Sequence, residues 1–276
     1  MEILERMERN LKLIKKFGLA SKIWDIAYPV LMYYAAISIG IICAQLVFGV
    51  SNESYMLCKT IGSVVALLYV YTEYKHDLIL RGEYGIKPQF SLGRFVNLVA
   101  VIGITVCLSI ALNNLISMSP LIDMSEEFQN ASDAFYGSNI WIELLGSALV
   151  TPLLEELLHR GVVYKRLRLM MGFAPSVLVS ALIFATLHFN IVQFIYAFLL
   201  GIALAIFVEK TGKVYPAVIA HMVANGIAVI RTETGFLMGT ADKSAFAWTI
   251  SVILCVVGVI GLVLYGMSIN RKRDKR

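Results

Sequence analysis

The sequence predicts an all-α, polytopic membrane bundle of about eight transmembrane helices, with both termini in the cytoplasm. Of its 276 residues, 58% are hydrophobic and only 16% are charged, and the mean hydropathy is +0.75. Soluble domains average about 45–50% apolar and about 25% charged residues. The charged residues are also bunched between long apolar runs, so one membrane bundle explains the chain better than one or two soluble domains.

The hydropathy pattern contains eight runs that could each cross a bilayer, which takes about 20 mainly apolar residues per helix. The second and fifth runs are short. No internal repeat and no long linker divides the chain. The predicted spans are Ala27–Val50, Met56–Thr72, Phe95–Ile116, Glu143–Lys165, Ala174–His188, Ile191–Val208, Tyr215–Ile230 and Ala245–Ile269.

Polar segments flank this block of spans. Residues 1–26 are mostly polar, and within them apolar residues recur at helical spacing among charges, which predicts an amphipathic cytoplasmic helix on the membrane surface. Residues 27–270 form the single predicted transmembrane domain, and residues 271–276 form a basic cytoplasmic tail. We expect no cleavable signal peptide, because no short apolar run with a small-residue cleavage site stands near the start.

The distribution of Lys and Arg predicts the orientation. With the N-terminus in the cytoplasm, eight spans place nearly every Lys and Arg in cytoplasmic segments, as the positive-inside rule requires. The opposite side receives only Lys59, Arg231 and Lys243, and its loop Ser117–Asn139 is acidic. The net charge of +5 is therefore a signal of membrane orientation, and we expect membrane lipid rather than nucleic acid as a partner.

The fourth predicted span carries two carboxylates and an arginine at membrane depth, namely Glu155, Glu156 and Arg160. An ionisable group inside a bilayer costs roughly 2.5–3.5 kcal/mol on insertion scales, so such groups face a partner or a cavity. Glu156 and Arg160 are four residues apart and share a helix face, which predicts a structural ion pair. Glu155 points about 100° away and is the candidate general base. A helix end at the membrane interface is the simpler explanation, but Arg166 and Arg168 mark that interface further on.

Two later spans carry the other polar residues. The fifth ends with Phe184 and His188, and the seventh contains His221 and Asn225, each pair at i,i+4 spacing. A single His on an apolar helix is more often a packing residue, but this set on three helices indicates a polar site. At 1.5 Å per residue, Glu155, His188 and His221 lie about 15, 21 and 9 Å from the cytoplasmic ends of their spans. We therefore expect them to meet in one cavity that opens to the cytoplasmic side.

Together these residues resemble the CPBP family of intramembrane proteases, the CAAX-protease and bacteriocin-processing or Abi family. The family pattern EExxxR, FxxxH, HxxxN on successive core helices is matched here by Glu155-Glu156…Arg160, Phe184…His188 and His221…Asn225. The resemblance covers about residues 143–230, the predicted protease core. His159 stands where the family usually has an aromatic residue, and a packing substitution is the favoured explanation.

The resemblance implies an intramembrane peptidase and a role for each residue. Glu155 would activate a water molecule for attack on the peptide carbonyl, and His188 would help to hold that water. His221 and Asn225 would stabilise the oxyanion as donors in a dry site. The predicted ion pair would fix the helix geometry, and Phe184 would shape the pocket. The implied substrate is a peptide or a lipid-anchored protein.

The sequence leaves two mechanisms open, one that depends on a metal ion and one that does not. Glu155, His188 and His221 could bind zinc with a water in the open position, and metalloprotease is the family's common label. A metal-free glutamate mechanism would use the same residues. We favour it because the chain has no HExxH motif, has an amide at Asn225 where a ligand would be expected, and disperses its candidate ligands over three helices. We therefore expect no cofactor, with zinc as the alternative.

Other functions stay open as alternatives. A transporter or proton relay would also use intramembrane Glu and His, but it predicts inverted repeats, and none is visible. A non-catalytic bacteriocin immunity or scaffold protein would keep the fold without turnover. Serine protease chemistry fits worse, because no GxSxG motif is present. We expect a multi-pass protein of a bacterial plasma membrane, because no organelle signal is visible.

Overall fold

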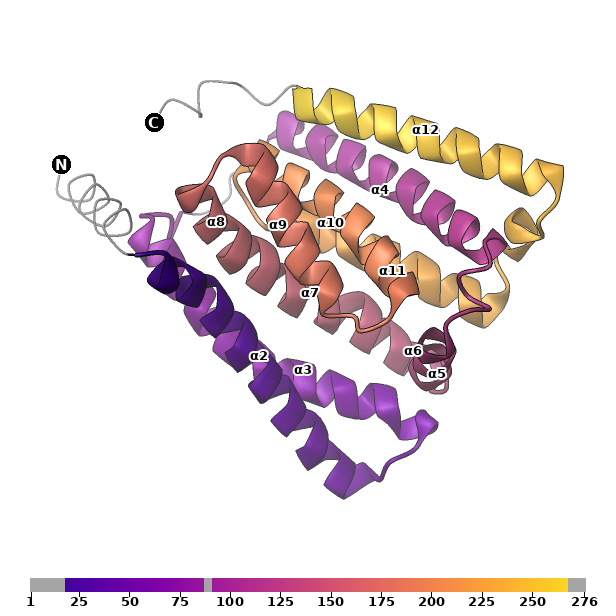
Figure 1. Ribbon diagram of the computed structural model, residues 1–276, viewed down its shortest axis with the longest axis horizontal. Helices are drawn as coiled ribbons and strands as arrows, with labels where there is room; N and C mark the ends of the chain where they lie inside the picture. Colours follow the sequence, from indigo (N-terminus) through magenta and orange to yellow (C-terminus); the bar gives the residue numbers. More distant parts are fainter. Residues whose placement is uncertain (1–17, 87–90, 268–276) are drawn as a thin grey trace.

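The computed structural model describes residues 18–86 and 91–267, and within these ranges the chain is built from helices connected by short loops (Figure 1). The predicted all-α fold class is therefore confirmed. The elements are α2 (Leu19–Phe48), α3 (Asn52–Leu80), α4 (Leu92–Met118), α5 (Glu126–Phe135), α6 (Ile140–Glu143), the π-helical η1 (Leu144–Val150), α7 (Thr151–Glu156), the π-helical η2 (Leu157–Tyr164), α8 (Lys165–Met170), α9 (Phe173–Thr186), α10 (Ile191–Thr211), α11 (Tyr215–Thr234), the 3₁₀ turn η3 (Met238–Ala241) and α12 (Ala245–Met267).

Each of the eight predicted spans coincides with a helix or, in the fourth case, with the run from α6 to α8. Five helices are long and apolar enough to cross a membrane, namely α2, α3, α4, α10 and α12. The other three predicted spans are the ones that carry the polar motif. α9 has only 14 residues, while His221, Asn225 and Arg231 interrupt the apolar run of α11. The chain is an integral membrane protein, and its polar motif lies on segments that are short or interrupted by polar residues.

The predicted segment boundaries fall partly beyond the described part of the chain. Most of the proposed surface helix, residues 1–17, lies outside the described residues, as does the basic tail within residues 268–276. α2 begins at Leu19, inside the segment 1–26. α5 was not predicted; it forms in the acidic loop, where Ser125 accepts a hydrogen bond from the Phe128 N–H and Glu126 and Glu127 occupy the first turn.

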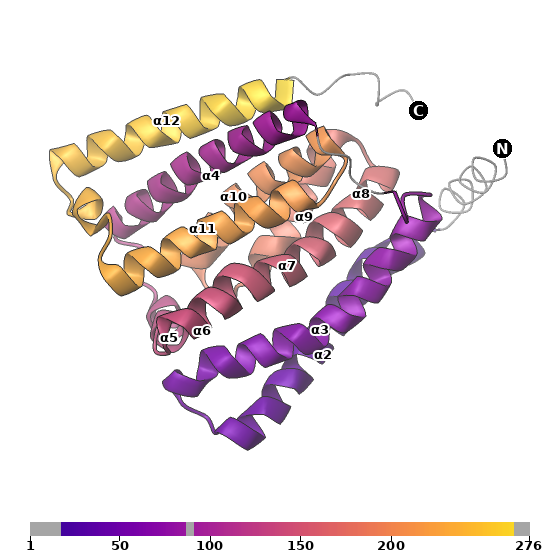
Figure 2. The same cartoon turned by 180° about the vertical axis from the view of Figure 1, so that it is seen from behind.

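The helices are arranged around a central group that carries the polar residues. α2 and α3 form a hairpin along one edge, and α4 and α12 lie side by side along the opposite edge (Figures 1 and 2). α7, α9, α10 and α11 lie between these two pairs. One apolar core centres on α10 and α11 and includes Leu204 and Phe207. A second joins the α2–α3 hairpin to α7 through Tyr33, Val70 and Leu154.

The α2–α3 hairpin is closed by two glycines that face each other. A Cβ atom added at Gly40 would lie 2.7 Å from the Gly62 Cα atom, and one added at Gly62 would lie 2.7 Å from the Ile37 carbonyl oxygen. Small residues allow helix backbones to approach in a membrane, where the hydrophobic effect does not drive helices together. This contact therefore depends on the absence of side chains at both positions.

The fourth predicted span departs from a regular α-helix twice. η1 and η2 lie on either side of α7, whose last two residues are Glu155 and Glu156. Short π-helical segments shift backbone hydrogen bonds from i→i+4 to i→i+5 and occur often at functional sites. The Thr151 N–H, accordingly, donates to the Gly146 carbonyl five residues earlier. A hydropathy pattern cannot predict this π-helical shift, because the shift does not depend on how apolar the span is.

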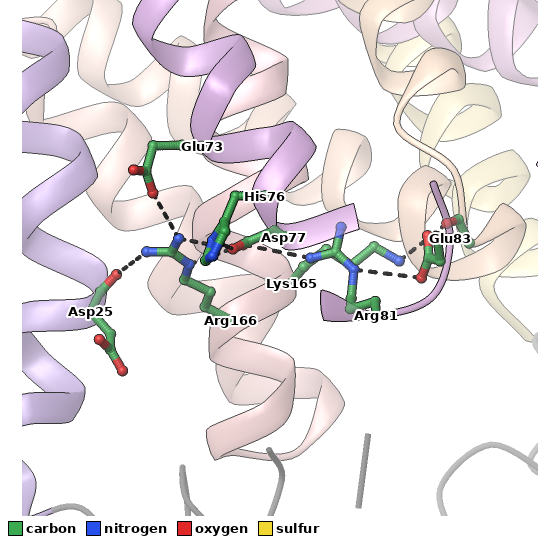
Figure 3. Close-up of polar contacts among 9 residues, drawn as sticks. Asp25, Glu73, His76, Asp77, Arg81, Glu83, Lys165 and Arg166 are labelled. Atoms are coloured by element: carbon green, nitrogen blue, oxygen red, sulfur yellow. Dashed lines mark hydrogen bonds and ion pairs between the residues drawn. The ribbon is translucent and has the colours of Figure 1, made fainter. Parts of the chain in front are cut away.

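An arginine ties the hairpin to α8 at the basic end of the bundle (Figure 3). The Arg166 guanidinium donates to both carboxylate oxygens of Asp77 at 2.9 Å and to Glu73 at 2.9 Å. Its Nη1 atom also donates to the Asp25 backbone carbonyl of α2 at 2.8 Å. That carbonyl is available because the residue four positions on is Pro29, which has no N–H to donate. Arg166 therefore joins three helices at once.

Two of the three cations predicted on the side opposite the cytoplasm lie within the protein. Arg231 is buried in α11 and donates to the Asn114 side chain of α4. Lys59 lies on α3, where its ammonium is 3.8 Å from the centre of the Phe135 ring. Only Lys243 is an exposed cation there. The asymmetry of surface Lys and Arg is thus sharper than a count along the sequence indicates.

We predict that Gly62→Ala destabilises the protein, because its methyl group would lie 2.7 Å from the Ile37 carbonyl and from the Ile41 side chain. Overpacking of this kind costs about 1–3 kcal/mol. Gly103→Ala, in α4, is the matched control, since nothing lies within 4 Å of its added Cβ. Thermal unfolding in detergent micelles would measure both. Equal melting temperatures for the two variants would contradict the packing role of Gly62.

Candidate active site

The predicted site residues surround one cavity of about 490 Å³. Glu155 enters it from the end of α7, His188 from the loop after α9, and His221 and Asn225 from one face of α11. The structure therefore brings together the four residues that the sequence placed on three separate spans. Phe184 also lines the cavity, while Glu156 and Arg160 lie behind it and are fully buried.

The Glu156 carboxylate is the central acceptor behind the cavity. Its Oε1 atom accepts from Arg160 Nη1 at 2.9 Å and from His221 Nδ1 at 2.9 Å. The predicted ion pair is present, and it extends to a histidine on another helix, which the i,i+4 argument did not foresee. Arg160 continues the network by donating from Nη2 to the Gly201 carbonyl of α10 at 3.2 Å. One carboxylate and one guanidinium thus connect α7, η2, α10 and α11.

Glycine at position 201 allows this contact. A Cβ atom there would lie 3.0 Å from Arg160 Nη2. The other face of the Arg160 guanidinium lies over the Phe184 ring, 4.4 Å from its centre. A cation above an aromatic face is attracted by the ring quadrupole, and more strongly where water is excluded. Phe184 therefore offsets part of the burial cost of Arg160, and its ring also makes T-shaped contacts with the rings of His159, His188 and His221.

His221 lies between the two adjacent glutamates. Because a carboxylate only accepts, the contact with Glu156 assigns a proton to His221 Nδ1. The other ring nitrogen, Nε2, is 3.8 Å from Glu155 Oε2. His221 therefore presents a lone pair towards Glu155 in its neutral form, and an N–H donor in its protonated form. This arrangement connects the candidate base with the buried ion pair through a single imidazole.

His188 is oriented by the backbone of its own helix. Its Nδ1 atom is 3.1 Å from the Phe184 carbonyl, which only accepts, so Nδ1 carries the proton. Nε2 is then the free acceptor of the neutral ring, as holding a water molecule requires. The next residue, Phe189, has φ 57°, in the left-handed region that residues other than Gly seldom adopt. This conformation turns the chain out of α9 and ends the helix at the site.

His159 is a buried histidine at the cavity wall. Its Nδ1 atom is 2.9 Å from the Glu155 backbone carbonyl, and its ring meets the Phe184 ring edge-on with centres 5.0 Å apart. No hydrogen-bond partner is present for its Nε2 atom among the residues described. These contacts are compatible with an aromatic packing residue, and that role stays a prediction.

Asn225 is held by an unusual acceptor. Its Nδ2 atom donates to the Ser147 backbone carbonyl at 2.8 Å. In the i→i+5 pattern of η1, the N–H that would reach Ser147 belongs to residue 152, which is Pro152 and has none. Asn225 supplies the missing donor and keeps one N–H and its oxygen for the cavity. Sequence analysis missed Ser147 and Pro152; the Thr-Pro dipeptide at the centre of the span was the available signal.

Lys59 is a second residue that the sequence interpretation missed. It was counted among the cations outside the membrane, although it lies within the predicted span Met56–Thr72. In the structure it lines the same cavity as Glu155. A lysine four residues into a predicted span was the signal that could have identified it.

The cavity wall also includes part of the acidic segment. Phe128 and Phe135 of α5 line it, together with Ile116 and Ser117 at the end of α4. Tyr33 and Tyr34 of α2 line another part, and the Tyr34 hydroxyl donates to the Leu187 carbonyl at 3.0 Å. The site is thus enclosed between the α2–α3 hairpin and the central helices.

The arrangement of the candidate ligands does not fit a metal ion. Within residues 18–86 and 91–267, no three His, Cys, Asp or Glu side chains lie close enough together to hold one. His221 Nδ1 is also occupied by Glu156.

Residues 137–227, about a third of the chain, match the family model described as type II CAAX prenyl endopeptidase Rce1-like. The matched segment contains all seven residues of the three-part motif and confirms the resemblance to the CPBP intramembrane proteases. The family implies a protease, and thus a hydrolase. No curated protein and no solved structure matches the chain.

We predict that Pro152→Ala lowers peptide cleavage by restoring an N–H that competes for the Ser147 carbonyl and so frees the Asn225 side chain. The expected fall in kcat is about tenfold, less than the 10²–10³ that follows loss of an oxyanion donor. Pro216→Ala is the control, since Pro216 lies in the first turn of α11, where an N–H has no intrahelical acceptor.

A double-mutant cycle separates this positioning role from a general loss of structure. In an Asn225→Ala background, Pro152→Ala should have no further effect on kcat, because the side chain that it releases is absent. Additive losses in the double variant, or an unchanged kcat in the single one, would contradict the proposed connection.

Proposed function

We propose that this chain, whose residues 137–227 resemble type II CAAX prenyl endopeptidases, is a CAAX-type intramembrane endopeptidase in which Glu155 activates the attacking water. One observation carries the proposal. Glu155, His188, His221 and Asn225 come from three separate spans and line one cavity, with His221 between Glu155 and the buried ion pair. Random packing of apolar helices gives no reason to gather four such polar groups in a bilayer.

The first step is proton transfer from water to Glu155. The carboxylate lies at the cavity wall, while Glu156 beside it is sealed from the cavity and already accepts two hydrogen bonds. Glu155 is therefore the carboxylate that is available to a water molecule. His188 Nε2 is the acceptor that would hold the water's second hydrogen. The resulting hydroxide attacks the carbonyl carbon of the scissile peptide.

The second step is stabilisation of the tetrahedral oxyanion and release of the amine. Asn225 retains one N–H after binding the Ser147 carbonyl, and protonated His221 presents Nε2–H. Both donors are held before substrate arrives, which is the condition for electrostatic stabilisation in a dry site. The proton on Glu155 then passes to the leaving nitrogen as the C–N bond breaks, giving a carboxylic acid and an amine.

The substrate and its route belong to the same proposal. A peptide segment in the membrane or a lipid-anchored protein fits a cavity walled mainly by aromatic and aliphatic residues. We keep access from the cytoplasmic side as a prediction, although α5 contributes part of the wall from the acidic segment. A bacterial plasma membrane is the expected location.

We predict that Glu155→Gln abolishes cleavage of a membrane-embedded or lipid-tailed peptide, with a loss of at least about 10²–10⁴, but leaves thermal stability unchanged. Glu156→Gln is the adjacent comparison. It removes the charge that compensates Arg160, and breaking a buried pair costs about 3–5 kcal/mol. Glu53→Gln, at the exposed start of α3, should change neither activity nor stability. Wild-type turnover by Glu155→Gln would exclude Glu155 as the base.

The same assay tests metal dependence. We expect turnover to persist after chelation once metal analysis verifies that the protein is metal-free, because Glu155 and His188 act on water directly in the proposed mechanism. A loss of activity on metal removal that zinc restores would replace this mechanism by the zinc-dependent one.

A further inference from the structure

Lys59 is a cation inside the bundle with no carboxylate bound to it. It lies about two turns inside α3, one of the five membrane-length helices. Its ammonium lies over the Phe135 ring, 3.8 Å from the ring centre. No ion pair joins it to any Asp or Glu of the described chain. An ammonium inside a bilayer is costly unless a partner or water compensates its charge. Such residues therefore usually bind a ligand or line a pathway for substrates or ions.

Lys59 lines the same cavity as the proposed catalytic residues. Of the described residues that line the cavity, Lys59 is the only Lys or Arg, and Glu155 is the only Asp or Glu. Both residues line the same cavity, yet no ion pair joins them, so their charged atoms are more than an ion-pair distance apart.

This separation matches a ligand that has a neutral group at one end and an anion at the other. Glu155 would repel an anion, whereas Lys59 would bind one. A peptide whose scissile carbonyl lies at Glu155 would reach Lys59 with the part of the chain that follows the cleaved bond. If cleavage occurs near the C-terminus, as in a C-a-a-X sequence, that part ends in a free α-carboxylate.

We propose that Lys59 binds the C-terminal carboxylate of the substrate and thereby selects peptides that end shortly after the scissile bond. The inference rests on the proposed function, which it deepens by naming the group that is recognised. The Phe135 ring of α5 lies against the ammonium and packs edge-on with Tyr55, their ring centres 5.7 Å apart. Lys59 itself lines the cavity, where a short anionic terminus would arrive.

The first test compares two peptides of the same sequence, one with a free C-terminal carboxylate and one with a C-terminal amide. The wild-type protein should cleave the acid with a kcat/KM at least about tenfold higher, as expected for a hydrogen bond between charged groups in a buried site. Lys59→Met should cleave both peptides at the rate of the amide. Lys59→Arg should keep part of the preference, and Lys243→Met, an exposed lysine far along the chain, should keep all of it.

The second test measures binding without turnover. The tripeptide Val-Leu-Ala as the free acid should raise the melting temperature of the Glu155→Gln protein, and its amide should not. Lys59→Met in the same background should lose the response to the acid. This readout separates the two proposals, since it requires no cleavage.

Three results would overturn the assignment. One is equal cleavage of acid and amide by the wild-type protein, together with equal stabilisation by the two tripeptides. Another is a Lys59→Met variant that loses activity on both peptides to the same extent, which would show that Lys59 acts through Glu155 or the fold. The third is loss of the wild-type preference when phosphatidylglycerol is added, which would assign the ammonium to a lipid phosphate. Failure of every peptide to be cleaved, with acid-specific binding intact, would refute the proposed activity and retain the carboxylate site.

Discussion

The hydrogen bonds from Arg160 and His221 to one oxygen of Glu156 are the constraint on which the rest of the structure depends. A buried carboxylate without a cation is expensive, and a buried guanidinium without an anion is equally so. The pair also needs further partners, and it finds them in Gly201 and Phe184 of the neighbouring helices. Satisfying two charges in the bundle interior therefore requires five helical segments to meet at one point, and the cavity forms beside that point.

Two prolines give rise to further polar contacts between helices. Pro29 leaves the Asp25 carbonyl of α2 without its intrahelical donor, and Arg166 of α8 supplies one. Pro152 does the same for Ser147 within the π-helical register, and Asn225 of α11 supplies the donor. In hydrocarbon no water can satisfy such a carbonyl, so a side chain from another helix must do so. Each proline thus leaves one backbone carbonyl of its helix without a donor, and a side chain from another helix binds that carbonyl.

The distribution of polarity over the helices follows from the same physics. The five helices that are long and apolar enough to span a membrane form the edges of the bundle and contribute α10 to its centre. The helices that carry the site are shorter, more polar or π-helical, and they lie between the two edge pairs (Figures 1 and 2). Their charged side chains Glu156 and Arg160 are fully buried, which keeps these groups from lipid beside the cavity. Within that cavity Glu155 and Lys59 are the two residues of opposite full charge, at different parts of the wall.

The sequence by itself determined the fold class and the location of the helices, and it predicted the polar residues that line the cavity, because hydropathy and i,i+4 spacing are local properties of a helix. It also predicted the Glu156–Arg160 pair, whose two members belong to one helical turn. Only the tertiary structure decided that His221 joins that pair, that Lys59 lies in the cavity, and that Ser147 holds Asn225. These contacts depend on the rotation of one helix against another and on the π-helical shift beside Pro152. Neither quantity is encoded in the spacing of residues along a single helix.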